Sequence, residues 1–559
     1  MRKISGDTMN DAGKGGAEGS SGDKSALLLG ALFVLSTAYL LWQHSLGVSW
    51  DFAAFVASAR HWFSGGTYFE VVDPPLTSLL LALLSVFGER ASEYLLIVLS
   101  SALFFWGVLR LSNVSRISAL LLYAFSLTPY MLWNATINGS ELLSLALLLL
   151  FITSALEGRW AAGMWLGLAV LTRYNLVMFA PLLLLLFRPD PWLIGSARYL
   201  KSASPTTSAR KTGRNDGKGS WRNWRQLLYG TLALIIVMVP WLLYCWIRWG
   251  HPLMGVADAY ALNIAFRRPY MATQTRWIDS LLPFGLLLPF ALWGLIIGLS
   301  AGRKQKGRGK DGQQGNEEER GKEEGGRKAS RGMARRAHAG DSGEIRMEDP
   351  LVSWVMFAVL LLGIIQYKGI IVRDLRYVFP LVLPAAYFSA LALRKFRAVG
   401  LVVLAMLVYS LVALGQVHDA TTHYHPSLYT SAIDTLQELN LTGCRLMSTS
   451  WPVLNYFGQL SEPSPREELL DSAIAEGNLV LLFWHEAEPE YVKDRKRMEL
   501  LSTLAESDTW ILLGTGACNA PRVYDMPYTW YLNETITQMR GEGVDIRVCH
   551  IFGLCGRPN

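Results

Sequence analysis

Charged residues are scarce in this chain: 17% of its 559 residues are Asp, Glu, Lys or Arg, whereas 51% are hydrophobic. Soluble domains typically carry about 25% charged residues. The composition therefore argues against an ordinary soluble protein and indicates a polytopic membrane protein, because several apolar blocks approach the ~20 residues that span a bilayer. We also expect no cleavable signal, since residues 1–24 are polar and Gly-rich.

Cysteine is scarce too, and it is unevenly placed. Four of the five cysteines follow residue 417, namely Cys444, Cys518, Cys549 and Cys555. An even number of cysteines in an oxidising compartment fits disulfides. We expect Cys549 to pair with Cys555 and Cys444 with Cys518, and four reduced, buried thiols remain the alternative.

Basic residues collect in two loops, residues 188–225 and 302–349. The first holds nine Lys or Arg against two Asp, and the second is rich in Gly, Lys and Glu. An excess of Lys and Arg marks the cytoplasmic side of a membrane protein. We therefore expect both loops, and a disordered tail at residues 1–24, to be cytoplasmic and the C-terminus to be external.

This sidedness predicts an α-helical domain of about eleven transmembrane helices over residues 25–416. The predicted spans are 26–45, 92–110, 117–132, 141–156, 160–173, 176–187, 227–247, 281–300, 351–367, 377–393 and 398–416. Residues 76–87 are too short for a span and predict a membrane-embedded helix within one long external loop, residues 46–91. A polar break at residues 172–175 separates two short spans, as happens where helices line a protein-walled cavity.

The chain changes character after residue 416, where residues 417–559 become mixed in polarity. Strand-like runs alternate with helical stretches, the strands at 446–448, 479–484, 510–514 and 548–553, and the helices at 431–439 and 491–504. This alternation predicts a small external α/β domain.

Polar and ionisable residues, among them carboxylates and guanidinium groups, gather on the expected external face. They are Asp51, His61, Tyr68, Glu70, Asp73, Glu141, Arg173, His251, Asp258, Arg267, Arg268, Lys368, Arg373, Asp374 and Arg376. Such a mixture suits a general base that faces a phosphate, because Arg offers a fixed fork of donors to an anion. Asp51 is prominent, since a carboxylate at a membrane face is costly without a partner or a task. A helix cap is its alternative role.

Several short motifs occur in an informative order. Asp51 precedes an aromatic, Gly-bearing stretch at residues 62–68, which is followed by Pro74-Pro75-Leu76, by the run from Gly167 to Arg173, and by Arg-Tyr-Val-Phe-Pro at 376–380. Over residues 26–416 the chain thereby resembles the polyprenyl-phosphate-dependent GT-C glycosyltransferases. Relatives in that group include protein O-mannosyltransferases and the lipid A aminoarabinose transferase.

The resemblance implies an enzyme that moves a sugar, of the hexosyl or mannosyl kind, from a polyprenyl or dolichyl phosphate to an acceptor hydroxyl outside the membrane, with inversion. Asp51 would be the general base, and Glu141 would complete the site. Glu141 is also an acid at a helix N-terminus, where the helix dipole favours it.

The same resemblance implies that basic residues hold the lipid phosphate. Arg376 is the first candidate and Arg173 the second, although Arg376 could instead snorkel to the membrane surface or pair with Asp374. Arg267 and Arg268 would contact anionic substrate or lipid headgroups. Substrate contacts are expected from two tyrosines, Tyr68 and Tyr377.

The chain departs from the family at Asp73, where relatives often have Lys or His before Pro-Pro. This puts phosphate binding at that position in doubt. Metal use varies within the family, so a divalent metal is a candidate cofactor without assigned ligands. The expected partners are the lipid-linked sugar, membrane lipids and an acceptor protein, glycan or lipid, with no nucleic acid.

We expect a prokaryotic plasma membrane as the location, in preference to the endoplasmic reticulum. Two other functions remain open. An oligosaccharyltransferase would share the loop Asp, but its Trp-Trp-Asp motif is absent from residues 417–559. A transporter commonly shows matching interrupted helices in two halves, whereas the breaks here cluster in the N-terminal half.

Overall fold

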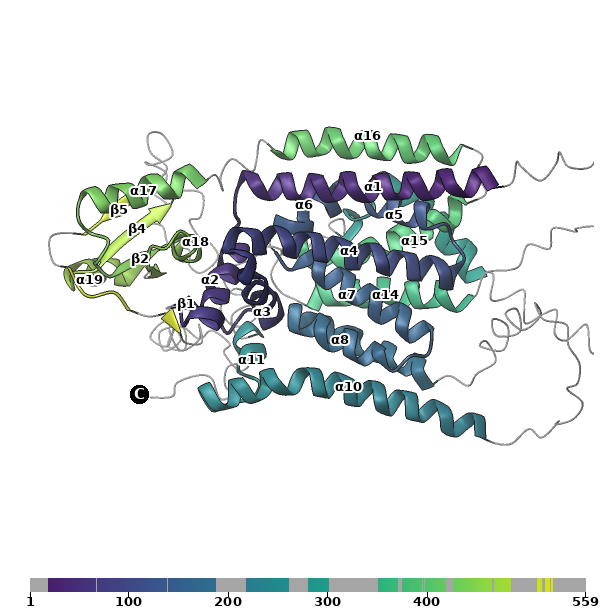
Figure 1. The fold of residues 1–559 in the computed structure, drawn as a ribbon, viewed down its shortest axis with the longest axis horizontal. Coiled ribbons are helices and arrows are strands. Elements are labelled where there is room, and N and C mark those ends of the chain that lie inside the picture. Colours follow the sequence, from purple (N-terminus) through teal and green to yellow (C-terminus); the bar gives the residue numbers. More distant parts are fainter. Residues whose placement is uncertain are drawn as a thin grey trace, which may run out of the picture.

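Long helices run side by side in an elongated body, and a small sheet with its own helices lies at one end of it (Figure 1). The computed structural model describes residues 19–66, 68–137, 139–187, 218–260, 280–300, 350–369, 375–394, 396, 398–418, 426–464, 467–483, 510–514, 518–522 and 524–525.

The helical body is built from long helices joined by shorter ones. The long helices are α1 (Gly19–Leu46), α4 (Glu89–Ser115), α7 (Glu141–Leu156), α8 (Ala161–Thr172), α10 (Lys218–Trp249), α14 (Pro350–Gly369), α15 (Val382–Leu393) and α16 (Val399–His418). The shorter helices are α5 (Ala119–Ser126), α6 (Pro129–Ile137) and α11 (Met254–Tyr260), and the 3-10 helices are η2 (Tyr174–Phe187), η5 (Gly285–Leu287) and η7 (Leu375–Leu381).

Five helices among the described residues are long and apolar enough to cross a membrane, or six if the bent pair α6 and α7 counts as one span. The five are Lys24–Leu46, Glu89–Ser115, Trp224–Trp249, Pro350–Tyr367 and Arg376–Leu393, and each matches a predicted span. Other predicted spans form apolar helices of 10–17 residues. The count of eleven and the sidedness of the loops therefore stay predictions.

The predicted span at residues 117–132 is wrong as a single helix. Helix α5 ends at Ser126, and α6 begins at Pro129. Proline disfavours the helical conformation in the residue before it, here Thr128. The Thr128 hydroxyl instead accepts a hydrogen bond from the Met131 N–H at 3.2 Å, which caps the new helix. The polar break at residues 172–175 is confirmed, since α8 ends at Thr172 and Arg173 is extended.

Helix α7 lies at the centre of the body, and its residues from Glu141 to Ala155 are all buried. Small residues let neighbouring helices approach closely: a Cβ added at Gly163 of α8 would lie 1.7 Å from the Gly230 carbonyl oxygen of α10. The outer helices expose apolar side chains instead, such as Ile247 of α10 and Leu401 of α16. These exposed apolar surfaces are what a lipid-facing helix requires.

The end of the body next to the sheet carries the segment predicted as the first external loop (Figure 1). It contains α2 (Trp50–Ser64), β1 (Tyr68–Phe69), α3 (Pro75–Leu84) and η1 (Ser85–Phe87). The predicted short helix at residues 76–87 is thus confirmed as α3 followed by η1. Its embedding in a membrane stays a prediction.

The C-terminal part contains a four-stranded mixed sheet with strand order β3-β2-β4-β5. Strand β2 (Leu446–Ser448) runs parallel to β3 (Glu462–Pro463) and β4 (Leu479–Phe483), and β5 (Trp510–Leu513) runs antiparallel to β4. Helices α17 (Pro426–Glu438), α18 (Trp451–Tyr456) and α19 (Glu467–Ala475) accompany it.

Three predicted strands and one predicted helix of the C-terminal part are thereby confirmed. The predicted strand at 548–553 and helix at 491–504 lie outside the described residues. A short parallel pairing of β1 with β6 (Tyr524–Asp525) links the first loop to the C-terminal part. One hydrophobic core runs from the helices into the sheet, reaching Tyr429 and Phe483.

Candidate active site

Asp51 lies in the first turn of α2. This helix lies at the end of the helical body beside the sheet (Figure 1). Ser49 is the N-cap of this helix, because its hydroxyl accepts a hydrogen bond from the Phe52 N–H at 3.3 Å. The alternative that Asp51 itself is the cap is therefore wrong. The Asp51 carboxylate is 29% exposed, so it stays partly accessible.

Arg376 forms an ion pair with Asp51, although 325 residues separate the two in sequence. Its Nη1 donates to Oδ2 of the carboxylate. Arg376 belongs to η7, the turn that leads into α15, and its side chain is 15% exposed. Asp374, the other partner considered for Arg376, lies outside the described residues.

Glu141 and Arg173 form a second ion pair in which Nη1 of Arg173 donates to Oε1 of Glu141. Glu141 is the first residue of α7 and is fully buried. Its Oε2 accepts a hydrogen bond from the Ser140 N–H at 3.2 Å. Arg173 follows the last residue of α8, so the predicted helix break brings its guanidinium to this carboxylate.

The Tyr377 ring joins the two ion pairs. The guanidinium carbon of Arg173 lies 5.4 Å from the centre of this ring, and that of Arg376 lies 5.7 Å from it. Both distances fit cation–π contacts, which are attractive within about 6 Å. Two arginines and two carboxylates therefore meet around one tyrosine, with formal charges that cancel. We call these five residues the ion-pair cluster: Asp51, Glu141, Arg173, Arg376 and Tyr377.

Each arginine of the ion-pair cluster is paired with a carboxylate, so an incoming anion has to compete with that acid. Arginine binds phosphate as readily as carboxylate, through the same fork of donors. An entering phosphate monoanion can therefore exchange with a carboxylate partner. Asp51 is the more exposed of the two acids, so it is the one that can be displaced towards solvent.

Tyr68 takes part in a different set of contacts. It is buried in β1 and its hydroxyl donates to Oε1 of Glu70. The same oxygen accepts a hydrogen bond from the Trp451 indole N–H at 3.0 Å. A substrate role for Tyr68 stays a prediction. Arg267 and Arg268 lie outside the described residues.

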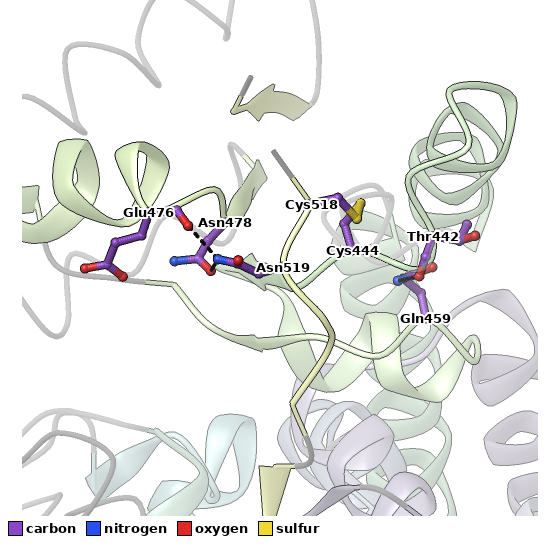
Figure 2. The surroundings of a disulfide bond; sticks show 7 residues. All are labelled: Thr442, Cys444, Gln459, Glu476, Asn478, Cys518 and Asn519. Atoms are coloured by element: carbon purple, nitrogen blue, oxygen red, sulfur yellow. Dashed lines mark hydrogen bonds between the residues drawn. A yellow bond between two sulfur atoms is a disulfide. The ribbon is translucent and has the colours of Figure 1, made fainter. Parts of the chain in front are cut away.

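Cys444 and Cys518 form a disulfide, as predicted for this pair (Figure 2). Nearby, the Asn519 side chain donates to the Glu476 carbonyl at 2.6 Å and to Oδ1 of Asn478 at 3.0 Å. The Cys444–Cys518 disulfide thus attaches the segment after β5 to the residues just before β2. Cys549 and Cys555, the other pair that the sequence predicts, lie outside the described residues. Within the described residues, no group of three His, Cys, Asp or Glu side chains is placed to bind a metal ion.

The sequence did not single out four further residues that lie beside α2. They are His44, Glu93, Trp451 and Tyr456. The sequence could have identified His44 and Glu93 as candidates, because ionisable residues within apolar helices are costly unless they have a partner. Trp451 and Tyr456 carried none, since their importance arises from contacts between distant segments.

The fold of this chain is similar to that of a solved structure. No family model matches the sequence, and no curated protein matches it. ArnT from Cupriavidus metallidurans bound to undecaprenyl phosphate is similar, with a TM-score of 0.51 and 11% identity over 87% of this chain and 95% of that one. This chain has an ArnT-like fold. The apo state of the same ArnT covers equal shares with a TM-score of 0.37.

The ArnT-like fold agrees with the GT-C resemblance that the motifs predict. The apolar helices and this fold together establish an integral membrane protein. At 11% identity the likeness concerns the fold, and the roles of individual residues need their own arguments.

Proposed function

We propose that this protein is a membrane glycosyltransferase that uses a polyprenyl-phosphate-linked sugar as donor. The observation that carries the proposal is the contact between Asp51 and Arg376, which brings a candidate base and a candidate phosphate ligand together. The ArnT-like fold supports it, because that ArnT structure is bound to undecaprenyl phosphate.

Asp51 is the general base of the proposed reaction. Its carboxylate takes the proton of the acceptor hydroxyl as the oxygen attacks the anomeric carbon of the donor sugar. A new glycosidic bond forms, the bond from that carbon to the phosphate oxygen breaks, and polyprenyl phosphate leaves. Attack from the side opposite to the phosphate inverts the anomeric centre.

Arg376 holds the phosphate and stabilises the charge that develops on the leaving group. In the structure described here its guanidinium is engaged by Asp51. Donor binding then exchanges one anion for another at Arg376 and releases the Asp51 carboxylate. The base becomes available only after the donor has bound, which implies that the donor binds before the acceptor.

Arg173 and Glu141 support the same site. Arg173 adds a second positive charge near the phosphate, and Glu141 fixes its guanidinium from a fully buried position. Tyr377 contacts both arginines and spaces them. We also propose substrate contacts for Tyr68, Arg267 and Arg268.

The donor is a polyprenyl phosphate carrying one sugar, of the hexosyl or mannosyl kind, and the acceptor is a hydroxyl on a protein, glycan or lipid. The end of the body that carries the ion-pair cluster and the sheet is proposed to face the outside. A bacterial plasma membrane fits a donor built on undecaprenyl phosphate, the lipid present in the ArnT structure.

The proposal is tested with purified protein and a panel of undecaprenyl phosphates, each carrying a different radiolabelled sugar, with extracted membranes as the source of acceptor. We expect one label to move to the acceptor while free undecaprenyl phosphate accumulates. In proteoliposomes, passage of the intact lipid-linked sugar across the membrane without cleavage would instead identify a transporter.

A further inference from the structure

Both neighbours of Asp51 in sequence, Trp50 and Phe52, are contacted from outside α2. The Trp50 ring meets the Trp451 ring edge to face, with centres 4.3 Å apart. The Phe52 ring lies against the His44 ring, with centres 4.4 Å apart. Phe52 is fully buried, so its position is fixed by packing.

Trp451 is itself fixed by a buried carboxylate. It is the first residue of α18, and its indole N–H donates to Oε1 of Glu70 at 3.0 Å. Trp451 and Glu70 are both buried. A hydrogen bond to a buried carboxylate is among the stronger ones in proteins, because the charge has little water to interact with. The ring that contacts Trp50 therefore has a defined orientation.

His44 is fixed by a second buried carboxylate, which is also bound by α18. Nε2 of His44 lies 2.7 Å from Oε2 of Glu93. Tyr456, the last residue of α18, donates its hydroxyl to the same carboxylate at 3.1 and 3.2 Å. Burial and then the Glu93 charge raise the pKa of the Tyr456 phenol well above its usual range, so the hydroxyl keeps its proton.

The far end of α18 is bound directly to α2. Arg60, on the third turn of α2, donates to the carbonyl oxygens of Asn455 and Tyr456, each at 2.6 Å. The last carbonyls of a helix lack partners within the helix, so the guanidinium satisfies that of Tyr456 and shares that of Asn455 with the Gly458 N–H. Helix α18 therefore contacts α2 near both of its ends.

We infer that α18 is a clamp that positions Asp51, with Trp451 as its main positioning residue. The inference rests on the proposed function, since it concerns how the base is placed. The C-terminal part thereby influences the reaction without contacting a substrate. Trp451, held by Glu70, fixes Trp50. Tyr456 fixes Phe52 indirectly, through Glu93 and His44. A base displaced by about 1 Å can lose about 10²-fold in rate.

The test compares two tryptophans of the C-terminal part. Trp451→Ala removes the contact with Trp50, and Trp510→Ala is the matched control, because Trp510 of β5 donates its indole N–H to Ser431 at 3.3 Å, away from α2. Trp451→Phe keeps a ring but loses the N–H donor. Each full-length variant is measured by hydrogen exchange at residues 50–56, by kcat and by the KM for the donor.

We expect Trp451→Ala to speed exchange at residues 50–56 by about tenfold and to lower kcat by about 10- to 10²-fold, with donor KM unchanged. Trp451→Phe should lie between it and the parent, and Trp510→Ala should match the parent. If Trp451→Ala does not fold, Trp451→Phe carries the test.

Parental exchange at residues 50–56 in a folded Trp451 variant would overturn the clamp, whatever the activity. Faster exchange with parental kcat would overturn the positioning role and leave Asp51 as base. A rise in donor KM with unchanged kcat would show that the contact serves binding. Absence of transfer by the parent would instead defeat the proposed function, and exchange would still decide whether the clamp exists.

Discussion

Nη1 of Arg376 donates to Oδ2 of Asp51, so two residues 325 positions apart form one ion pair at the end of the helical body. The pair ties a candidate base to a candidate phosphate ligand. While this ion pair is intact, Asp51 cannot act as the base and Arg376 cannot hold the donor phosphate. The arrangement therefore predicts competition between the donor phosphate and Asp51, which ordinary binding measurements can detect.

Arg376→Ala should weaken the binding of undecaprenyl phosphate to the purified protein by about 10- to 100-fold, because a hydrogen bond to a charged group contributes about 1.5–3 kcal/mol. Arg159→Ala is the matched control, since Arg159 is largely exposed and pairs with Glu157. Equal affinities of the Arg376 variant and the parent for the lipid would remove Arg376 from the phosphate site.

Glu141→Ala should destabilise the protein by about 3–5 kcal/mol, because it leaves the Arg173 charge in a buried place without its carboxylate. Adding Arg173→Ala should recover part of that loss, so the double variant should be more stable than the sum of the two single changes allows. Thermal unfolding of all four proteins in detergent measures this. Strict additivity would mean that the two side chains do not interact.

The sequence identified Asp51, Glu141, Arg173 and Arg376 as separate candidates, and the structure brings these four together with Tyr377. Which acid meets which arginine was not predictable, because the partners lie on segments far apart in the chain. The break at residues 172–175 was visible from its polar residues. The interruption at Pro129 is hidden in the sequence, because the apolar pattern continues on both sides of it.

The clamp could not be predicted from the sequence, for a different physical reason. Strands β2, β4 and β5 follow from local apolar runs, but the seating of α18 on α2 depends on complementary surfaces. Trp451 and Tyr456 lie in no motif, and their partners Glu70 and Glu93 come from other segments. The buried carboxylate that Trp451 or Tyr456 contacts is determined by the tertiary structure and cannot be deduced from the sequence.

Mass spectrometry of unreduced, alkylated protein should find Cys444 linked to Cys518 and Cys245 as a free thiol. The bond closes a loop with a sequence separation of 74 residues, so replacing both cysteines by Ser should cost about 2–4 kcal/mol of stability. Alkylation of Cys444 and Cys518 without reductant would contradict the disulfide.

A reporter fused after Asn559 and a glycosylation tag at Arg268 should both report the external compartment. The physical reason is the excess of Lys and Arg in residues 188–225 and 302–349, which favours a cytoplasmic location for those loops. A tag within residues 302–349 is the control and should stay cytoplasmic. Cytoplasmic signals at Asn559 and Arg268 would invert the proposed sidedness.

The most direct test of the account measures Asp51→Asn protein for both sugar transfer and binding of undecaprenyl phosphate. Asn keeps the size of the side chain but cannot accept the proton, so transfer should fall by about 10²- to 10⁴-fold. Binding of the lipid should be unchanged or tighter, because the neutral amide competes less strongly for Arg376 than the carboxylate does. Transfer at near the parental rate by folded Asp51→Asn protein that binds the lipid would contradict Asp51 as the base.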